Sequence, residues 1–251
     1  MSENGQASLV TTAHRHVAGE VIERHAHPFH QLIYVSSGVL AVRTDATAWV
    51  ASRSRAMWVP AQTPHQHRVH GSSLVYTIGF ASADAPLPTA APAIVSVGPL
   101  LRELLIAGSA PELPEDERER IRAVLCDRLR HSALQPLLLP VPCDRRLARA
   151  CELVTEDLAR PRGIAWLARR SGVSERTLTR LFRTEFGLTY PQWRTSVRIF
   201  HAMIGLAEGA TVTEAGQRCG WATTSAFVDV FTRTLGQTPG KYRSAVTGER
   251  G

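Results

Sequence analysis

The sequence predicts an α+β protein: an antiparallel β-barrel followed by helices in the first half, and an all-helical second half. Two observations carry this prediction. Short β segments separated by turn signals fill residues 19–80, and one helix-turn-helix pattern occurs twice after residue 160. With 251 residues, 44% of them hydrophobic, the chain is long enough for two globular domains.

The β segments occupy the region that we assign to the barrel, residues 19–98, after a polar N-terminal arm at residues 1–18. They combine β-branched and aromatic residues with flanking turn residues. The segments are Gln31–Val35, Val39–Arg43, Ala56–Val59 and Leu74–Phe80. Alanine and proline dominate residues 81–99, a composition that favours an extended connector at the end of the barrel.

Two helices are predicted in the next region, residues 99–134, at Leu100–Ala107 and Glu115–Ala133. The second carries an apolar stripe of Ile121, Val124, Leu125 and Leu129. Such a stripe must be covered, and the pattern leaves two partners open: the barrel, or the same helix of a second copy in a homodimer. Residues 135–143, which contain three prolines, are assigned as a linker.

The repeat in residues 144–251 has the signature of two helices joined by a tight turn. Each copy places a small residue four positions before a glycine, Ala168 before Gly172 and Gly216 before Gly220. Each then continues into a helix with an aromatic core residue, Phe182 or Phe231. A single long helix is expected between the copies, at Pro191–Glu208.

The excess positive charge lies on this repeated half. Residues 1–143 hold 12 basic and 12 acidic side chains, whereas residues 144–251 hold 17 and 10, which accounts for the whole net charge of +7. A solvated surface explains a basic patch alone, but the coincidence with a helix-turn-helix pair favours a polyanion such as DNA. All but one of the 29 cationic residues are arginines, which suit phosphates and guanine edges.

The predicted DNA-facing side chains lie opposite the apolar face of the second helix of each unit. In the first unit they are three cations and two hydroxyls, and in the second unit they are less basic. The full set, with two cations near the C-terminus, is Arg176, Thr177, Thr179, Arg180, Arg183, Thr224, Ser225, Asp229, Arg233, Lys241 and Arg243. Asp229 repels phosphate unless it accepts a hydrogen bond from a cytosine amino group or holds a neighbouring arginine.

Residues 144–245 resemble the AraC family of bacterial transcription regulators. The matching motifs are Ala168-x3-Gly172-Val173-Ser174, Leu178-x3-Phe182, Phe227-x3-Phe231-x4-Gly236-x-Thr238-Pro239 and Tyr242-Arg243. The resemblance implies two helix-turn-helix units on one long helix, promoter DNA as partner, and RNA polymerase as a further partner of an activator. It also implies base contacts by Arg176, Thr179 and Arg180, and by Thr224 and Ser225. Asp229 departs from the arginine often found there, which puts base contacts by the second helix in doubt.

The first half contains spacings that resemble the two cupin motifs. Gly19-x5-His25-x-His27-x3-Gln31-x6-Gly38 follows the first, with glutamine in place of a metal-binding glutamate, and Pro60-x-Gln62-x2-His65 follows the second more loosely. Alternate residues of a strand share a face, so a barrel can gather His25, His27, Gln31 and His65, with His67 as a further candidate.

This histidine set leaves two ligands open. Three imidazoles can hold a divalent transition metal, with Zn, Ni, Fe and Mn as candidates, although an amide at position 31 lacks the charge of a glutamate. Alternatively, the histidines hydrogen-bond within the barrel or to a small organic effector, without a metal. His30, His67 and His70 are expected mainly at the rim or surface.

Together these patterns predict a DNA-binding transcription regulator, not an enzyme, that responds to a small molecule or metal in its first half. Four cysteines without C-x-x-C spacing, the lack of an apolar run long enough for a bilayer and the lack of a secretory signal indicate a cytoplasmic protein with no membrane partner. The alternatives are a metal-dependent cupin enzyme fused to a DNA-binding domain, and an architectural DNA binder whose sensor has degenerated. Glutamine at position 31 and the absence of an acid/base pair beside the histidines argue against the enzyme.

Overall fold

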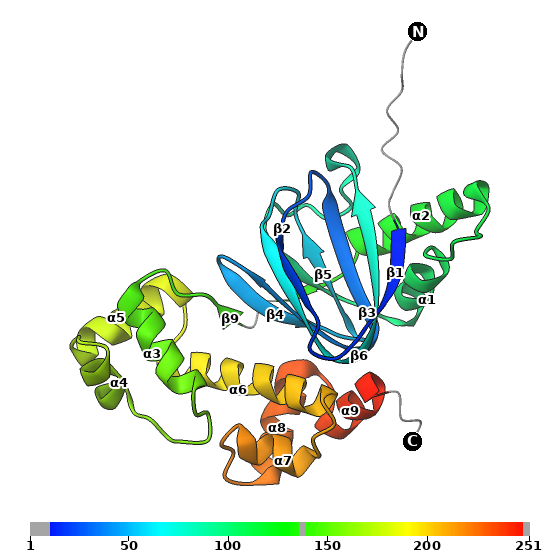
Figure 1. Ribbon diagram of the computed structural model, residues 1–251. Coiled ribbons are helices and arrows are strands. Elements are labelled where there is room, and N and C mark those ends of the chain that lie inside the picture. Colours follow the sequence, from blue (N-terminus) through cyan, green and yellow to red (C-terminus); the bar gives the residue numbers. More distant parts are fainter. Residues whose placement is uncertain (1–10, 136–138, 248–251) are drawn as a thin grey trace. The chain divides into compact units, whose positions relative to one another are not determined.

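The computed structural model describes residues 11–135 and 139–247, which fall into two compact units (Figure 1). Unit 1 comprises residues 1–42 and 51–136, and unit 2 comprises residues 43–50 and 137–251. The first ten residues of the predicted arm, three residues of the predicted linker (136–138) and the last four residues lie outside the described ranges.

Unit 1 is built on an antiparallel sheet, which confirms the predicted fold class for this half. The hydrogen-bonded order is β1-β6-β3-β5-β7-β8, with β2 also paired to β6 and β4 paired to β3 and β9. This order does not close on itself among the described residues, so the sheet is an open one and "barrel" describes it only loosely. The strands are β1 Thr11–His16, β2 Val21–His25, β3 His30–Thr44, β4 Thr47–Ala51, β5 Arg55–Val59, β6 His65–Phe80, β7 Ala93–Ser96, β8 Leu134–Gln135 and β9 Leu139–Pro140.

Three segments differ from the sequence prediction. Thr11–His16, assigned to the polar arm, is strand β1 and pairs along its whole length with β6. The two segments expected at 31–35 and 39–43 are one continuous strand, β3, because Gly38 adopts a φ of 72° within it and the pairing continues. Residues 81–99, expected as an extended connector, contain the short helix η1 (Ser82–Asp84) and strand β7.

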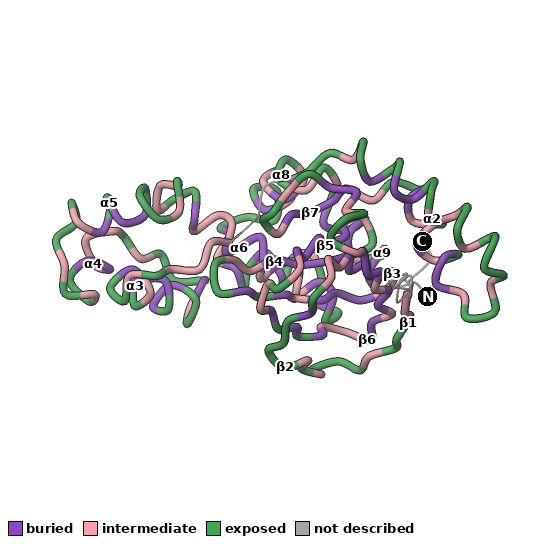
Figure 2. The backbone as a smooth tube through the Cα atoms, turned by 90° about the horizontal axis from the view of Figure 1, so that it is seen from above, coloured by how far each residue is buried: buried purple, intermediate pink, exposed green. Residues whose placement is uncertain are grey.

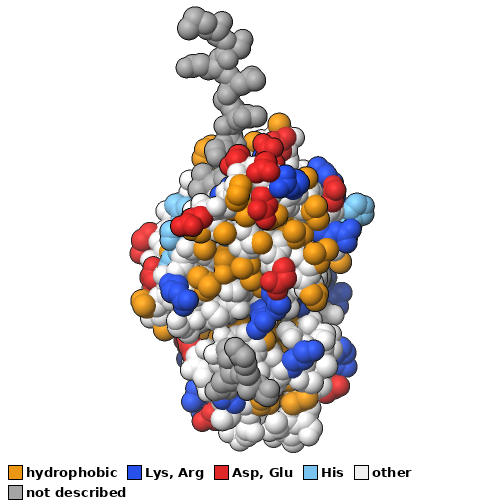
Figure 3. Space-filling view, turned by 90° about the vertical axis from the view of Figure 1, so that its right-hand side faces the viewer, with side chains coloured by type: hydrophobic (Ala, Val, Ile, Leu, Met, Phe, Trp, Pro, Cys, Tyr) orange, Lys and Arg blue, Asp and Glu red, His pale blue; other side chains and the backbone are white. Residues whose placement is uncertain are grey.

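Helices α1 (Pro99–Ala107) and α2 (Glu115–Arg130) lie beside this sheet (Figure 1). Leu125 and Leu129 of the predicted stripe belong to the same buried cluster as sheet residues such as Trp58. Val124, by contrast, stays 44% exposed. Two of the four stripe residues therefore pack into the core that the sheet shares with the helices. Figure 3, which looks at the side where Figure 1 shows α1 and α2, has apolar side chains scattered among acidic and basic ones.

Apart from strands β4 and β9, the described part of unit 2 is helical, as predicted for the second half. Its helices are α3 Arg145–Thr155, α4 Ile164–Arg170, α5 Glu175–Phe186, α6 Tyr190–Ala207, α7 Val212–Arg218, α8 Thr224–Leu235 and α9 Pro239–Thr247. Figure 2 shows buried and exposed residues alternating along α3, α4 and α5, as expected of helices that bury one face. The apolar spacing of each helix therefore determines which face is buried and which face stays exposed to solvent.

The helix α6 joins the two helix-turn-helix units, close to the bounds expected from the sequence. A reciprocal capping box between Thr189 and Gln192 starts it. Trp193, Val197 and Phe200 are buried along its inner face. The start of α3 is also tied to α5, because the backbone N–H groups of Cys143 and Asp144 donate to the Glu185 carboxylate.

Candidate DNA-binding faces and histidine cluster

The first helix-turn-helix unit consists of α4 and α5, joined by a turn in which Gly172 adopts a φ of 69°. Ser174 caps α5, its hydroxyl accepting from the backbone N–H of Thr177 at 3.1 Å. Leu178, Leu181 and Phe182 are buried beneath α5. These contacts set the rotation of α5 about its axis and so determine which side chains point outward.

Within the part of the chain that the structure describes, the cations on the outward face of α5 have no partner. Arg176, Thr179, Arg180 and Arg183 are exposed. Among the described residues, none of these three guanidinium groups makes a hydrogen bond or an ion pair. Thr177 is half-buried, and its hydroxyl lies 2.9 Å from that of Ser174, so part of its hydrogen-bonding capacity is used by the cap. The face is thus free to contact phosphates and base edges.

The second unit consists of α7 and α8 and is built on the same plan. Thr223, rather than Thr224, caps α8, its hydroxyl accepting from the backbone N–H of Ala226 at 3.2 Å. Phe227 and Phe231 are fully buried under the helix. The turn before it contains Gly220 with a φ of 80°.

The outward face of α8 is less basic, and its one arginine is paired. Thr224, Ser225, Asp229 and Arg233 are exposed. The Arg233 guanidinium lies 3.4 Å from the Asp229 carboxylate, with both side chains 71% exposed. Of the two alternatives for Asp229, the structure shows the neighbouring arginine as its partner. In α9, Lys241 is exposed, whereas Arg243 is half-buried and interacts with other groups of the chain.

Three histidines of unit 1 meet where β2 pairs with β6. His25, the last residue of β2, is in register with His65, and His67 follows on the same face of β6. Their ring centroids are 4.3 Å apart for His25–His65 and 5.0 Å for His65–His67. One nitrogen from each ring lies within 4.8 Å of the others, so the three rings could hold a metal ion. We call these three residues the histidine cluster.

Hydrogen bonds fix the tautomers of two members of the histidine cluster. The Nδ1 of His65 lies 2.8 Å from the Thr63 carbonyl, and the Nδ1 of His25 lies 2.8 Å from the Glu23 carbonyl. A carbonyl can only accept, so each Nδ1 carries the hydrogen and each Nε2 of a neutral ring keeps a lone pair. Second-sphere carbonyls orient metal-binding histidines in the same way.

Burial keeps the deeper members of the histidine cluster neutral. His65 and His67 are 1% and 5% exposed, while His25 is exposed. Loss of solvation lowers the pKa of His65 to about 4, and burial with the nearby His65 lowers the pKa of His67 to about 3. The Nε2 of His65 and both ring nitrogens of His67 are buried and have no hydrogen-bond partner in residues 11–135 and 139–247. A ligand that accepts lone pairs from ring nitrogens therefore fits the histidine cluster.

The structure differs from the expected ligand set of His25, His27, Gln31 and His65. His27 comes after β2 has ended, so strand alternation no longer sets its direction. Its Nδ1 lies 2.6 Å from the Phe29 carbonyl and its Nε2 lies 3.1 Å from the Gln31 side-chain oxygen. His27 and Gln31 therefore satisfy each other beside the histidine cluster, and His67 takes the third place.

Of the histidines expected at the rim, His67 is buried, while His30 and His70 are half-buried. His30 stacks on Trp58 and its Nδ1 accepts from the backbone N–H of Ala61. His67 is the one member of the cluster placed too cautiously by sequence reasoning. The signal that could have found it is its spacing of two from His65, which puts both on one face of β6.

Comparisons with known proteins agree with both halves of this description. A helix-turn-helix domain family matches residues 167–245, which span most of both units, and a cupin domain family matches residues 14–78. The HTH-type transcriptional regulator NimR of Escherichia coli K12 is 28% identical over 226 residues, covering 89% of this chain and 82% of NimR. The HTH-type transcriptional activator RhaR of Salmonella schwarzengrund is 32% identical over 107 residues, covering 41% of this chain and 38% of RhaR.

The chain combines an AraC-type helix-turn-helix domain with a cupin domain, as AraC-family transcription regulators do. It is a DNA-binding regulator with a cupin-like N-terminal domain, and its relatives are regulators rather than enzymes, which sets the cupin-enzyme alternative aside. Among solved structures, unsaturated fatty acid-bound ToxT from Vibrio cholerae is similar, with 13% identity, a TM-score of 0.43 and full coverage of both chains. Among the described residues, no helix of this AraC-family regulator is both long and apolar enough to cross a membrane.

Proposed function

We propose that this AraC-family regulator changes its occupancy of promoter DNA when a divalent transition metal binds to His25, His65 and His67. One observation carries the proposal: the buried rings of His65 and His67 converge with His25, and three of their ring nitrogens have no hydrogen-bond partner among the described residues. A buried polar atom without a partner costs free energy, and a metal ion would recover that cost at several nitrogens together. When bound, the metal would supply a fixed charge and a cross-link between β2 and β6.

The donor chemistry narrows the choice of metal. Imidazole nitrogen suits zinc, nickel and iron, whereas manganese prefers oxygen ligands. The position that is a glutamate in metal-binding cupins is Gln31 here, and its amide is engaged with His27. The histidine cluster therefore offers nitrogen without a compensating carboxylate, which ranks zinc and nickel above manganese.

On the DNA side, the proposed base readers are Arg176, Thr179 and Arg180 of α5, with Thr224 and Ser225 of α8. Exposure of all five side chains supports this assignment, as does the lack of partners for the two arginines among the residues that the structure describes. The other proposed DNA contacts are Thr177, Arg183, Asp229, Arg233, Lys241 and Arg243. Because Arg233 is paired and Arg243 is half-buried, these two contribute less than Arg183.

The remaining parts of the proposal concern organisation. Residues 19–98 serve as the sensor, 99–134 as a bridge between two copies in a homodimer, 135–143 as the linker and 144–251 as the DNA-binding domain. Exposed Leu100 and Val124, on α1 and α2, support a contact between copies. Promoter DNA as the target places the protein in the cytoplasm, and RNA polymerase is a further partner where it activates.

The experiment measures metal uptake and DNA binding on the same full-length samples. Metal-free protein is titrated with zinc and with nickel, bound metal is counted by mass spectrometry, and DNA affinity is measured by fluorescence anisotropy with and without metal. An effector shifts an equilibrium only as far as it prefers one state, so we expect one metal per chain and a changed DNA affinity. His67→Ala should weaken metal binding by at least about 100-fold.

His131→Ala is the matched control, because His131 lies at the end of α2, outside the histidine cluster. It should leave metal uptake and the DNA response intact, and circular dichroism checks that both variants fold. Equal metal uptake by His67→Ala and the parent protein would overturn the metal assignment. A response of DNA affinity to an organic molecule, lost in His67→Ala without any metal uptake, would replace the metal by an organic effector.

A further inference from the structure

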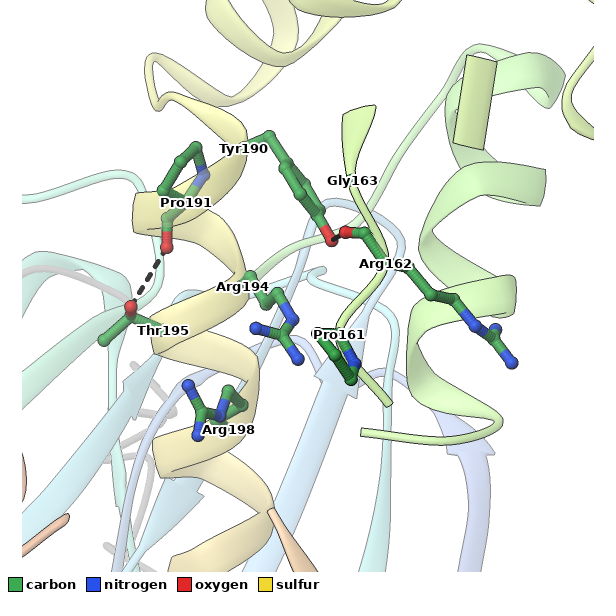
Figure 4. Close-up of a pocket in the computed structure, with 8 residues that line it drawn as sticks. All are labelled: Pro161, Arg162, Gly163, Tyr190, Pro191, Arg194, Thr195 and Arg198. Atoms are coloured by element: carbon green, nitrogen blue, oxygen red, sulfur yellow. Dashed lines mark hydrogen bonds between the residues drawn. The ribbon is translucent and has the colours of Figure 1, made fainter. Parts of the chain in front are cut away.

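Unit 2 contains a cavity of about 360 Å³ between α6 and the loop that precedes α4 (Figure 4). Pro161 and Gly163 form one wall, and Tyr190 and Pro191 lie at the start of α6. Arg194 and Arg198, one helical turn apart on α6, complete the lining together with Arg162 and Thr195. The cavity shares no lining residue with the outward face of α5 or with the histidine cluster, and the proposed function does not use it.

The positive charge in this cavity is uncompensated. None of the residues that line it is acidic, and among the described residues neither Arg194 nor Arg198 forms an ion pair. Like charges four residues apart on a helix repel each other. Burial, followed by the proximity of Arg194, lowers the pKa of Arg198 to about 10, yet that group stays protonated at neutral pH. Two guanidinium groups held together without a counter-charge favour an anion between them.

Both arginines are held in place by the protein backbone. Arg194 donates from Nη2 to the carbonyls of Leu158 and Arg160, at 3.2 and 3.3 Å. Arg198 donates from Nε to the carbonyl of Cys219 and stacks on the Trp221 ring. These contacts use only some of the N–H groups, and the Nε of Arg194 is buried with no partner. Pre-organised guanidinium groups lose little side-chain entropy when they bind an anion.

The other wall residues indicate the size and character of the anion. The Tyr190 hydroxyl is occupied, since it donates to the Arg162 carbonyl, and Thr195 donates to the Pro191 carbonyl, as Figure 4 shows. The Arg162 guanidinium points away from the cavity in that view and packs over Trp166. The rings of Tyr190, Pro161 and Pro191 thus leave apolar walls beside a cationic floor. The volume suits a small molecule.

We propose that this cavity binds the carboxylate or phosphate group of a small organic acid, held by Arg194 and Arg198 against the apolar rings of Tyr190 and the two prolines. Carboxylates and phosphates match the planar fork of arginine. The site bridges the loop before α4 to α6, while Arg198 also reaches the backbone and Trp221 beside α7. A bound anion would stiffen the connection between the two helix-turn-helix units, so the DNA-binding domain would itself respond to a metabolite.

The test uses the full-length protein, with benzoate and inorganic phosphate as probes and benzamide as the uncharged counterpart of benzoate. Binding is followed by NMR titration, reading tryptophan side-chain signals. We expect saturable binding of benzoate or phosphate and none of benzamide. Arg194→Gln should weaken binding by about 10-fold or more, because it removes a charge-assisted hydrogen bond. Arg194→Lys, which keeps the charge but loses the fork, should fall between Arg194→Gln and the parent protein.

Arg160→Gln is the matched control: it removes one positive charge from the loop that forms the opposite wall, but its side chain does not line the cavity. Equal weakening by Arg160→Gln and Arg194→Gln would overturn the proposal in favour of a general charge effect, as would equal binding of benzamide. If no small anion binds but a short DNA duplex perturbs the same signals and Arg194→Gln removes that effect, the cavity is a contact for the DNA backbone and the proposal fails. None of these results depends on the histidine cluster.

Discussion

The two helix-turn-helix units of this chain are alike in their caps and buried residues and different in their exposed residues. Helices α5 and α8 are each capped by a hydroxyl, Ser174 or Thr223, and each ends at a glycine in the left-handed region. Each buries aromatic side chains beneath it. On the exposed faces, the arginines of α5 have no partner among the described residues, whereas the arginine of α8 is paired with Asp229. The inner residues therefore fix where a helix lies, and the outer ones are free to set what it contacts.

Among the tests of this comparison, we expect the largest effect from replacing the buried phenylalanines. Phe182 and Phe231 are both fully buried, so Phe182→Ala and Phe231→Ala should each lower the free energy of unfolding by about 3–5 kcal/mol. Denaturant unfolding followed by tryptophan fluorescence measures both. Thr179→Ala on the exposed face should change it by about 0.5 kcal/mol or less. A large loss for one phenylalanine and a negligible loss for the other would show that the units are not equivalent inside.

The turn glycines test the comparison with a smaller effect. Gly172 and Gly220 both have positive φ, which costs a non-glycine residue about 1–2 kcal/mol. A Cβ on Gly220 would lie 2.5 Å from the Leu158 carbonyl oxygen, whereas one on Gly172 would meet nothing within 4 Å. Gly220→Ala should therefore lower the melting temperature clearly more than Gly172→Ala. Equal losses would mean that the second turn is no tighter than the first.

The smallest expected effect concerns the ion pair on α8. Asp229→Asn keeps the shape of the side chain but releases Arg233, so binding to random DNA at low salt should tighten by no more than about 5-fold. The dependence of affinity on salt should also steepen. Asp127→Asn, which breaks a similar exposed pair with Arg130 on α2, controls for net charge. The idea that Asp229 restrains this face is lost if both variants tighten binding equally.

Local patterns predicted unit 2 better than unit 1. Caps, turn glycines and apolar spacing act within a few residues of the chain, so the bounds of α5 and α6 and the free face of Arg176 and Arg180 followed from the sequence. Sheet pairing joins distant segments, and nothing near Thr11–His16 indicates that β6 is its partner. For this reason strands β1 and β7 could not be placed from their own residues.

The histidine cluster shows the same limit within a single site. Two of its members, His25 and His65, followed from motif spacing. The third, His67, was a further candidate from its spacing of two from His65. That His67 and not His27 completes the cluster depended on where β2 ends and on the irregular register between Ile22 and His25, which no spacing rule contains. The cavity at Arg194 and Arg198 was also beyond sequence reasoning, because its walls come from the loop before α4 and from α6.

The most direct test of the central claim, that the unpartnered face of α5 is the principal reader of DNA, compares Arg180→Ala with Arg233→Ala. A cognate duplex is first selected from a random pool, and the affinity of each variant is measured for that duplex and for a random one. We predict that Arg180→Ala weakens cognate binding by about 1–3 kcal/mol and random binding much less, while Arg233→Ala has little effect on either. Equal losses for the two variants, or a larger cognate loss for Arg233→Ala, would contradict the claim.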